Sequence, residues 1–367
     1  MAGPGRSQLD RALRVAAILL TVVVLVLGAT ELLMRALFEP PSRPYTQRTL
    51  FGTTRTPDYR AFKISVDDGT PFEFVVNPLG FRGKSMRTAK KPPGVFRVFF
   101  VGASSTENQH LPEEKTFPGL VEQALAARGM KVEVANCGIA GQGVARSFSL
   151  IFHRLLELEP DLIVLEAGID DMLASLDERW DPLAGPPGEP EGVRFKDWLL
   201  GRSRLVQVLD APAEVDVRPL LEKRRRAAHA RPLSVPPDLD LARGVPTFER
   251  YLHLVALACE DRGTKVSFLT QPALWKDECS PAELDALWMA GATRGPVRLD
   301  PRGCRKLLDA YDDATRRVAR GRLLVDLARE VPRDLSCFHD DALLTARGNE
   351  LVARAVMAEL EKSGILK

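Results

Sequence analysis

Small and acidic side chains follow three hydrophobic segments of this chain, at the point where each segment ends. Ser104 follows residues 95–101, the glycine-rich loop 136–143 follows a second segment, and Gly168 and Asp170 end a third. A serine hydroxyl at such a place is exposed and can act as a nucleophile, while glycine amides can stabilise an oxyanion. Acyl-transfer chemistry is therefore possible at these loops. Small residues at strand ends also serve simple packing, so each loop by itself is weakly specific.

Two acidic pairs, 170–171 and 340–341, bring four carboxylates to the same set of loops. Carboxylates suit divalent cations, but no histidine alternates with them, and aspartates at these places also cap helices. The 5 cysteines show no CxxC or Cys/His ligand spacing. We therefore expect no metal site, no other cofactor and no disulfide framework.

The elements that must position these loops alternate regularly along residues 95–367. Hydrophobic strands and amphipathic helices follow one another, which predicts one doubly wound α/β domain whose ligands bind at the carboxyl ends of the strands. A charged, Pro/Gly-rich insertion interrupts it at about 181–245, with a helical pair at 193–209 and a solvated helix face at 222–231. Strands are expected at 95–101, 131–135, 161–168, 265–270 and 323–326, and helices at 117–128, 147–158, 248–262, 307–320 and 348–362.

The N-terminus has a different character. Residues 15–30 carry no charge and follow Arg6, Arg11 and Arg14, which predicts a membrane anchor over 15–38. The lack of a polar face disfavours a buried core helix. A cleaved secretory signal is the alternative, although no good small-x-small cleavage site is present.

The flanking charges place residues 1–14 in the cytoplasm and the bulk of the chain outside it. Residues 39–94 are rich in Pro, Thr and Arg and are expected to form a stalk or N-terminal extension, with an edge strand at 72–76. The whole chain has 367 residues, 51 Lys and Arg against 49 Asp and Glu, and a net charge of +2. We therefore expect a membrane as partner and no nucleic acid.

Four segments together resemble the sequence blocks of the SGNH/GDSL hydrolases, in family order. Residues 100–107, 136–143, 168–171 and 340–353 look like the first, second, third and fifth blocks. Upstream, residues 77–83 resemble the N-x-x-G-F-R-G of membrane-anchored members. Gln271-Pro272 and residues 203–205 also fit that subgroup.

The resemblance implies a flavodoxin-like, three-layer domain that hydrolyses or transfers acyl groups on oxygen esters, often acetyl groups on saccharides. A saccharide or lipid ester is then the implied ligand. Ser104 matches the nucleophile, and Gly141 matches the glycine whose N–H binds the oxyanion. Gly168 and Asp170 belong to the third block, at the oxyanion and substrate-binding positions. Asp340 matches the acid that orients the catalytic histidine.

Two departures from the family pattern weaken the expected chemistry. The third block should read G-x-N-D, but Asp170 stands at the asparagine position, where an ionised carboxylate would repel the oxyanion. Loss of one such donor costs about 10²–10³ in rate. The fifth block should read D-x-x-H, but Leu343 stands at the histidine position. A serine without a base is a poor nucleophile at neutral pH.

Another histidine could replace the missing base. His339 is adjacent to Asp340 and could swing towards Ser104 from an extended loop, but packing is the simpler role for its ring. His110 is a weaker candidate, and the remaining three histidines, His153, His229 and His253, lie in predicted helices or the insertion.

The sequence thus predicts a membrane-anchored, serine-esterase-like protein with an impaired or altered catalytic site. Two other functions stay open. The domain could bind a glycan, lipid or protein without turning it over, or it could be a scaffold of the cell envelope.

Overall fold

The computed structural model divides the chain into two units, which are described separately: residues 1–43 with 189–213, and residues 44–188 with 214–367. The residues that the structure describes are 4–37, 46–49, 52–177, 180–182, 203, 205, 216–230, 232–234, 240–289 and 297–366.

The first unit contains the long helix α1, Pro4–Leu37. Its segment Leu13–Leu37 has a mean hydropathy of 2.5, and none of it is buried. At ~1.5 Å per residue this segment exceeds the ~30 Å hydrocarbon core of a bilayer. The chain therefore has one N-terminal helix that is long and apolar enough to span a membrane. Within the same unit, Glu31 accepts hydrogen bonds from the Ser203 hydroxyl at 2.8 Å and the Leu205 amide at 2.9 Å.

The second unit is built on a parallel sheet of 5 strands in the order β6-β5-β7-β8-β9. This is the flavodoxin-like order 2-1-3-4-5, so the predicted fold class is confirmed. The strands are β5 (Phe96–Val101), β6 (Val132–Asn136), β7 (Leu162–Glu166), β8 (Lys265–Leu269) and β9 (Leu323–Val325).

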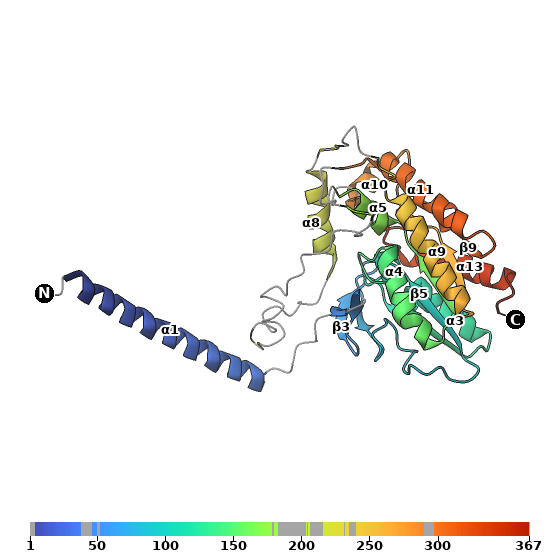
Figure 1. The fold of residues 1–367 in the computed structure, drawn as a ribbon. Helices are drawn as coiled ribbons and strands as arrows, with labels where there is room; N and C mark the ends of the chain where they lie inside the picture. The colour runs from blue at the N-terminus through green and yellow to red at the C-terminus, as the bar shows by residue number, and fades with distance from the viewer. Residues whose placement is uncertain are drawn as a thin grey trace. The chain divides into compact units, whose positions relative to one another are not determined.

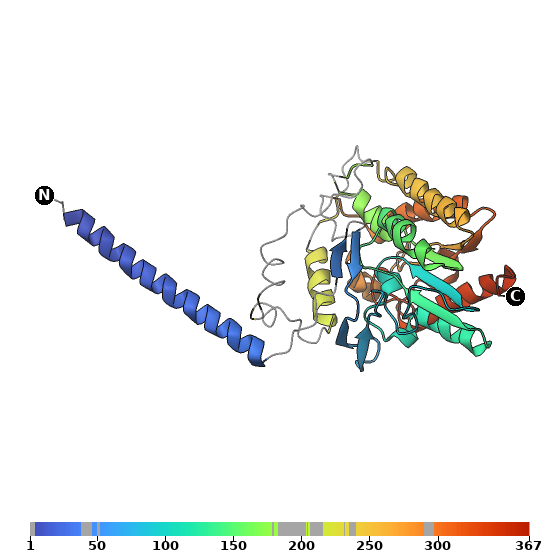
Figure 2. The same cartoon turned by 60° about the horizontal axis from the view of Figure 1, so that its bottom comes forward.

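Helices cover both faces of the sheet (Figures 1 and 2). On one face α3 (Phe117–Ala127) contacts α13 (Ala346–Lys362). On the other, α9 (Val245–Asp261) contacts both α4 (Val144–Leu150) and α11 (Pro301–Val318). The result is the expected three-layer sandwich.

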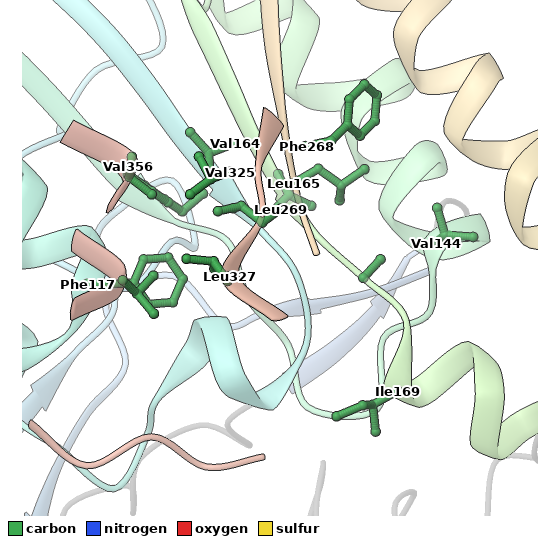
Figure 3. Close-up of a cluster of buried hydrophobic side chains, with 14 of the residues drawn as sticks. Phe117, Val144, Val164, Leu165, Ile169, Phe268, Leu269, Val325, Leu327 and Val356 are labelled. Atoms are coloured by element: carbon green, nitrogen blue, oxygen red, sulfur yellow. The ribbon is translucent and has the colours of Figure 1, made fainter. Parts of the chain in front are cut away.

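The central strand β5 shows why its sequence is continuously hydrophobic. Successive side chains of a strand point to opposite faces, and both faces of this sheet are covered. Phe100 packs edge-on against Phe117 of α3 at 5.5 Å between ring centroids, while Phe99 packs against Phe81 at 5.5 Å. Figure 3 shows this core, with Phe117 and Val356 on the α3 and α13 side of the strand residues.

Several elements differ from the predicted bounds. Helix α11 begins at Pro301 rather than at residue 307, because the Asp300 side chain caps it by accepting the Gly303 amide at 2.6 Å. Proline and glycine in this first turn look like a break in the sequence, yet proline fits the first helical position. The helix predicted at 147–158 begins at Val144 and ends in a π turn and a 3₁₀ turn, Ile151–Leu155 and Leu156–Leu158.

The short helices of the loops were not predicted. They are α2 (Ser104–Glu107), η1 (Glu113–Lys115), α5 (Ile169–Ser175), α10 (Pro281–Ala286) and α12 (Leu327–Glu330). In the insertion the structure describes α8 (Arg218–His229), which overlaps the predicted helix face 222–231. The helical pair expected at 193–209 lies outside the described residues, apart from 203 and 205.

The N-terminal segment expected as a stalk or extension packs in the same unit as the sheet. Its described part holds two antiparallel hairpins, and the second contributes a small core of Tyr59, Phe74 and Val76. The hairpin strands are β1 (Thr46–Thr49), β2 (Gly52–Arg55), β3 (Arg60–Ile64) and β4 (Pro71–Val75).

A buried ion pair fixes this segment beside Ser104. Arg55 and Glu107 have side chains that are each 1% exposed, and their charged atoms lie 3.2 Å apart. Arg55 also donates to the Asn136 carbonyl at 3.0 Å, and Glu107 accepts the Ala140 amide at 3.1 Å. The pair therefore joins the N-terminal segment to two of the loops at the edge of the sheet.

We expect Arg55→Met to lower the free energy of unfolding by about 3–5 kcal/mol, because it leaves the Glu107 carboxylate buried without its partner. The matched control is Arg60→Met. Arg60 pairs with Glu73 at 2.8 Å, but their side chains are 66% and 33% exposed, so we expect a loss of about 0–1 kcal/mol. Urea unfolding of the detergent-solubilised chain, followed by tryptophan fluorescence, measures both. Equal losses would contradict this assignment.

Candidate active site

Ser104 stands on a tight turn at the carboxyl end of the central strand. It follows β5 after Gly102 and Ala103 and opens the single turn α2. A Cβ on Gly102 would lie 2.1 Å from Oγ1 of Thr106, so only glycine fits there. Ser104 is partly buried, and its hydroxyl makes no hydrogen bond within the described part of the chain. It is thus open to a ligand.

A buried carboxylate binds two side chains of this turn. Glu166, at the end of β7, accepts hydrogen bonds from the hydroxyls of Ser105 and Thr106 at 2.9 and 2.6 Å. The Gln271 amide donates to its other oxygen at 3.0 Å. Burial raises the pKa of Glu166 above its ordinary value despite these bonds. Sequence reasoning missed this residue, although a glutamate in a hydrophobic strand was the available signal.

The second loop packs directly on the Ser104 turn. The Ile139 amide donates to the Gly102 carbonyl at 3.0 Å, and a Cβ on Gly138 would lie 2.4 Å from the Glu107 nitrogen. Gly141 is exposed, with a φ of +77° that favours glycine. Within the described ranges its amide has no hydrogen-bond partner. This amide can therefore donate to a ligand, as the sequence predicts.

The third loop holds the aspartate pair at the start of α5. Gly168 precedes the helix with a φ of +151°, and a Cβ there would approach the Gln271 side chain. Asp171 caps α4 by accepting the Val144 amide at 2.9 and 3.1 Å. Asp170, in contrast, makes no side-chain hydrogen bond in the part of the chain that is described.

Burial raises the pKa of Asp170 to about 7, and the nearby Glu166 carboxylate adds to the shift while Arg146 opposes it. Burial also raises the pKa of Asp171 to about 7. Asp170 is therefore only partly ionised near neutrality, which softens but does not remove its repulsion of an oxyanion.

The aspartate turn of the fifth block does not carry a histidine. Asp340 is fully buried and accepts hydrogen bonds from the amides of Ala342 and Leu343 at 3.0 and 2.8 Å. Its second oxygen accepts the indole N–H of Trp288 at 2.7 Å. The Asp340 carboxylate thus accepts hydrogen bonds from one indole and two backbone amides.

His339 points to the N-terminal segment. Its Nε2 bonds to Asp67, in the turn between β3 and β4, and the other oxygen of Asp67 accepts the Ala346 amide at 2.8 Å. Burial alone would raise the pKa of Asp67, but its hydrogen bonds with His339 and Ala346 lower it. No hydrogen bond between His339 and Ser104 exists among the described residues. No sequence pattern indicates this pair, whose members are 272 positions apart.

His110 is the other histidine near these loops. Its Nε2 lies 3.0 Å from the Leu344 carbonyl, and its ring meets that of His339 edge-on at 5.5 Å. Burial lowers the pKa of His110 to about 3, so the ring is neutral at pH 7. His110 therefore joins the first and fifth blocks as an uncharged, buried group.

Asn349 makes a second connection between these two blocks. Its side-chain oxygen accepts the Asn108 amide at 3.1 Å and the backbone amide of Phe117 at 2.8 Å. These bonds hold the loop after Ser104 against the start of α13.

The described residues contain no group of three or more His, Cys, Asp and Glu that could hold a metal ion. All 5 cysteines lie in the described part of the chain and carry free thiols.

No protein-family profile matches the chain. An arylesterase from Vibrio mimicus is 30% identical over 77 residues, which cover 21% of this chain and 38% of that relative. The match therefore spans well under half of the relative.

Solved structures similar to this chain include an acetylxylan esterase from Geobacillus stearothermophilus, with 15% identity and a TM-score of 0.41 over 72% of this chain and 94% of that one. A further acetyl xylan esterase has 16% identity and a TM-score of 0.41, over 72% and 98%. TesA has 15% identity and a TM-score of 0.43, over 72% and 98%.

We expect Asp170→Asn to stabilise the protein increasingly as the pH rises from about 4 to about 7. The folded state holds the Asp170 proton more tightly than the unfolded chain, so the parent loses stability across this range. The gain should reach about 1–3 kcal/mol at pH 7. Urea unfolding at several pH values measures it, with Asp170→Glu as a control that keeps a titrating carboxyl. A stability difference that does not change with pH would contradict the assignment.

Proposed function

We propose that this chain is a membrane-anchored, SGNH/GDSL-type serine-esterase-like protein that binds O-acyl esters of saccharides but turns them over poorly. The observation that carries the proposal is the hydrogen-bond set of Asp340. Trp288 and two backbone amides satisfy this carboxylate, and Leu343 stands where a base is needed. A fold with the nucleophile and without its base retains binding and loses efficient hydrolysis.

The ligand-binding half of the site supports this proposal. The Ser104 hydroxyl and the Gly141 amide have no partners within the described ranges, and both lie on loops packed against one another. The Gly141 amide can donate a hydrogen bond to the carbonyl oxygen of an acyl ester, and the Ser104 hydroxyl can then lie next to the carbonyl carbon. The esterase descriptions of the similar proteins agree with an ester ligand.

The catalytic half is deficient in two ways. Among the described residues no side chain accepts a hydrogen bond from the Ser104 hydroxyl, and an ionised Asp170 would oppose charge on the carbonyl oxygen. The Nε2 atom of His339 is bonded to Asp67, and no hydrogen bond between His339 and Ser104 exists among the described residues, so we assign His339 a structural role that joins the N-terminal segment to the aspartate turn. The alternative function is that of a catalytically inactive binding or scaffold protein of the cell envelope. It differs from the proposed function only in that no ester is hydrolysed.

We expect the purified protein to hydrolyse p-nitrophenyl acetate slowly, and Ser104→Ala to change the rate by less than about threefold, because without a base the hydroxyl adds little to solution chemistry. Ser363→Ala, at the end of α13, is the control. A large, Ser104-dependent turnover would show that the site is intact. If His339→Ala then abolished that turnover, His339 would be the replacement base.

We also expect the chain to be an integral membrane protein with the large unit outside the cytoplasm. The full chain should stay with membranes in alkaline carbonate, and a chain without residues 1–37 should not, because α1 supplies the apolar segment. Protease added to intact spheroplasts should digest the large unit. Protection of the large unit would reverse the orientation, and cleavage after α1 in the mature protein would favour a secretory signal.

A further inference from the structure

Trp288 makes a contact that the esterase-like chemistry does not need. Its indole Nε1 donates to Oδ2 of Asp340 at 2.7 Å, while both backbone donors of the turn, Ala342 and Leu343, use Oδ1. In a serine triad the acid accepts the N–H of the histidine. The indole therefore binds the oxygen of Asp340 that the two backbone amides leave free.

The backbone around Trp288 is fixed as well. The amides of Trp288 and Met289 both donate to Oδ2 of Asp341, at 2.7 and 3.0 Å. The other oxygen of Asp341 accepts the indole N–H of Trp275 at 2.8 Å. The two neighbouring aspartates thus each bind one tryptophan indole, and the second aspartate sets the position of the first indole.

Helix α8 of the insertion also contacts residues 286–288. Arg225 donates to the carbonyls of Ala286 and His339, at 3.2 and 2.8 Å, and so joins the Trp288 segment to the aspartate turn. His229 contacts the Leu287 carbonyl at 2.9 Å. The guanidinium of Arg224 lies 4.7 Å from the Trp288 ring, in cation–π geometry.

We infer that Trp288 is a positioning residue that takes the place of the imidazole on Asp340, and that α8 keeps it there. The inference rests on the proposed function and deepens it. The catalytic acid has become a structural acceptor, so the loss of activity has a second cause besides Leu343. A histidine returned at position 343 then has to compete with the Trp288 indole for this oxygen, so we expect that substitution alone to be insufficient.

The test introduces Leu343→His into three backgrounds of the full-length chain: parent, Trp288→Phe and Trp275→Phe. Trp288→Phe keeps a ring but removes the indole N–H from Asp340. Trp275→Phe is the matched control, because it removes an indole N–H from Asp341 instead. The readout is the pKa of the introduced imidazole, followed by NMR.

We expect that pKa to be higher by about one unit or more in the Trp288→Phe background, because a freed carboxylate that accepts the ring N–H favours the imidazolium form. The parent and Trp275→Phe backgrounds should agree with each other. Equal values in all three backgrounds would overturn the inference. If Trp288→Phe does not fold, Trp288→Met allows the same comparison, since it also lacks the donor.

Hydrolysis of p-nitrophenyl acetate gives the second readout. We expect the double variant Leu343→His, Trp288→Phe to hydrolyse this ester at least about tenfold faster than Leu343→His alone. Orientation of the imidazole by an acid raises the rate of a serine triad by up to about 10⁴. Full activity with Leu343→His alone would overturn the inference. Rapid Ser104-dependent turnover by the parent would overturn the proposed function, while the pKa comparison would still decide the role of Trp288.

Discussion

Three buried carboxylates connect the loops at this edge of the sheet, because each takes hydrogen-bond donors from a distant part of the chain. An ionised carboxylate without partners costs several kcal/mol in a protein interior. Glu107, Glu166 and Asp340 are each at most 1% exposed, and each is satisfied by groups from a different part of the chain. The donors come from the N-terminal segment, from the turn after β8 and from the Trp288 segment. The hydrogen bonds of these three acids therefore hold the loops together.

The same constraint accounts for the hydrogen bonds of Asp340. Without an imidazole, Asp340 would be a buried acid with one unsatisfied oxygen. The Trp288 indole supplies a neutral donor of sufficient length, and the carboxylate remains paired. The Ser104 hydroxyl and the Gly141 amide, in contrast, have no hydrogen-bond partner within the described ranges, and water or a ligand can satisfy them.

The N-terminal segment belongs to this arrangement. It brings Arg55 to Glu107 and Asp67 to His339, so it touches both the nucleophile turn and the aspartate turn. The N-terminal segment thus connects these two turns, although its sequence has the composition of a stalk.

The sequence by itself determined the layers of the domain, because hydrophobic periodicity reflects burial on one or both faces of an element. It also predicted Ser104 and Gly141 at the edge where the parallel strands end, and the family resemblance pointed to Leu343 at a position where that family has a histidine. The partners of the buried charges were decided only by the tertiary structure. Which donor reaches Asp340 or His339 depends on the path of segments such as that of Trp288, which lies 52 positions from the acid it binds. The local sequence pattern does not predict such contacts, because the two residues are far apart in the sequence and meet only when the chain is folded.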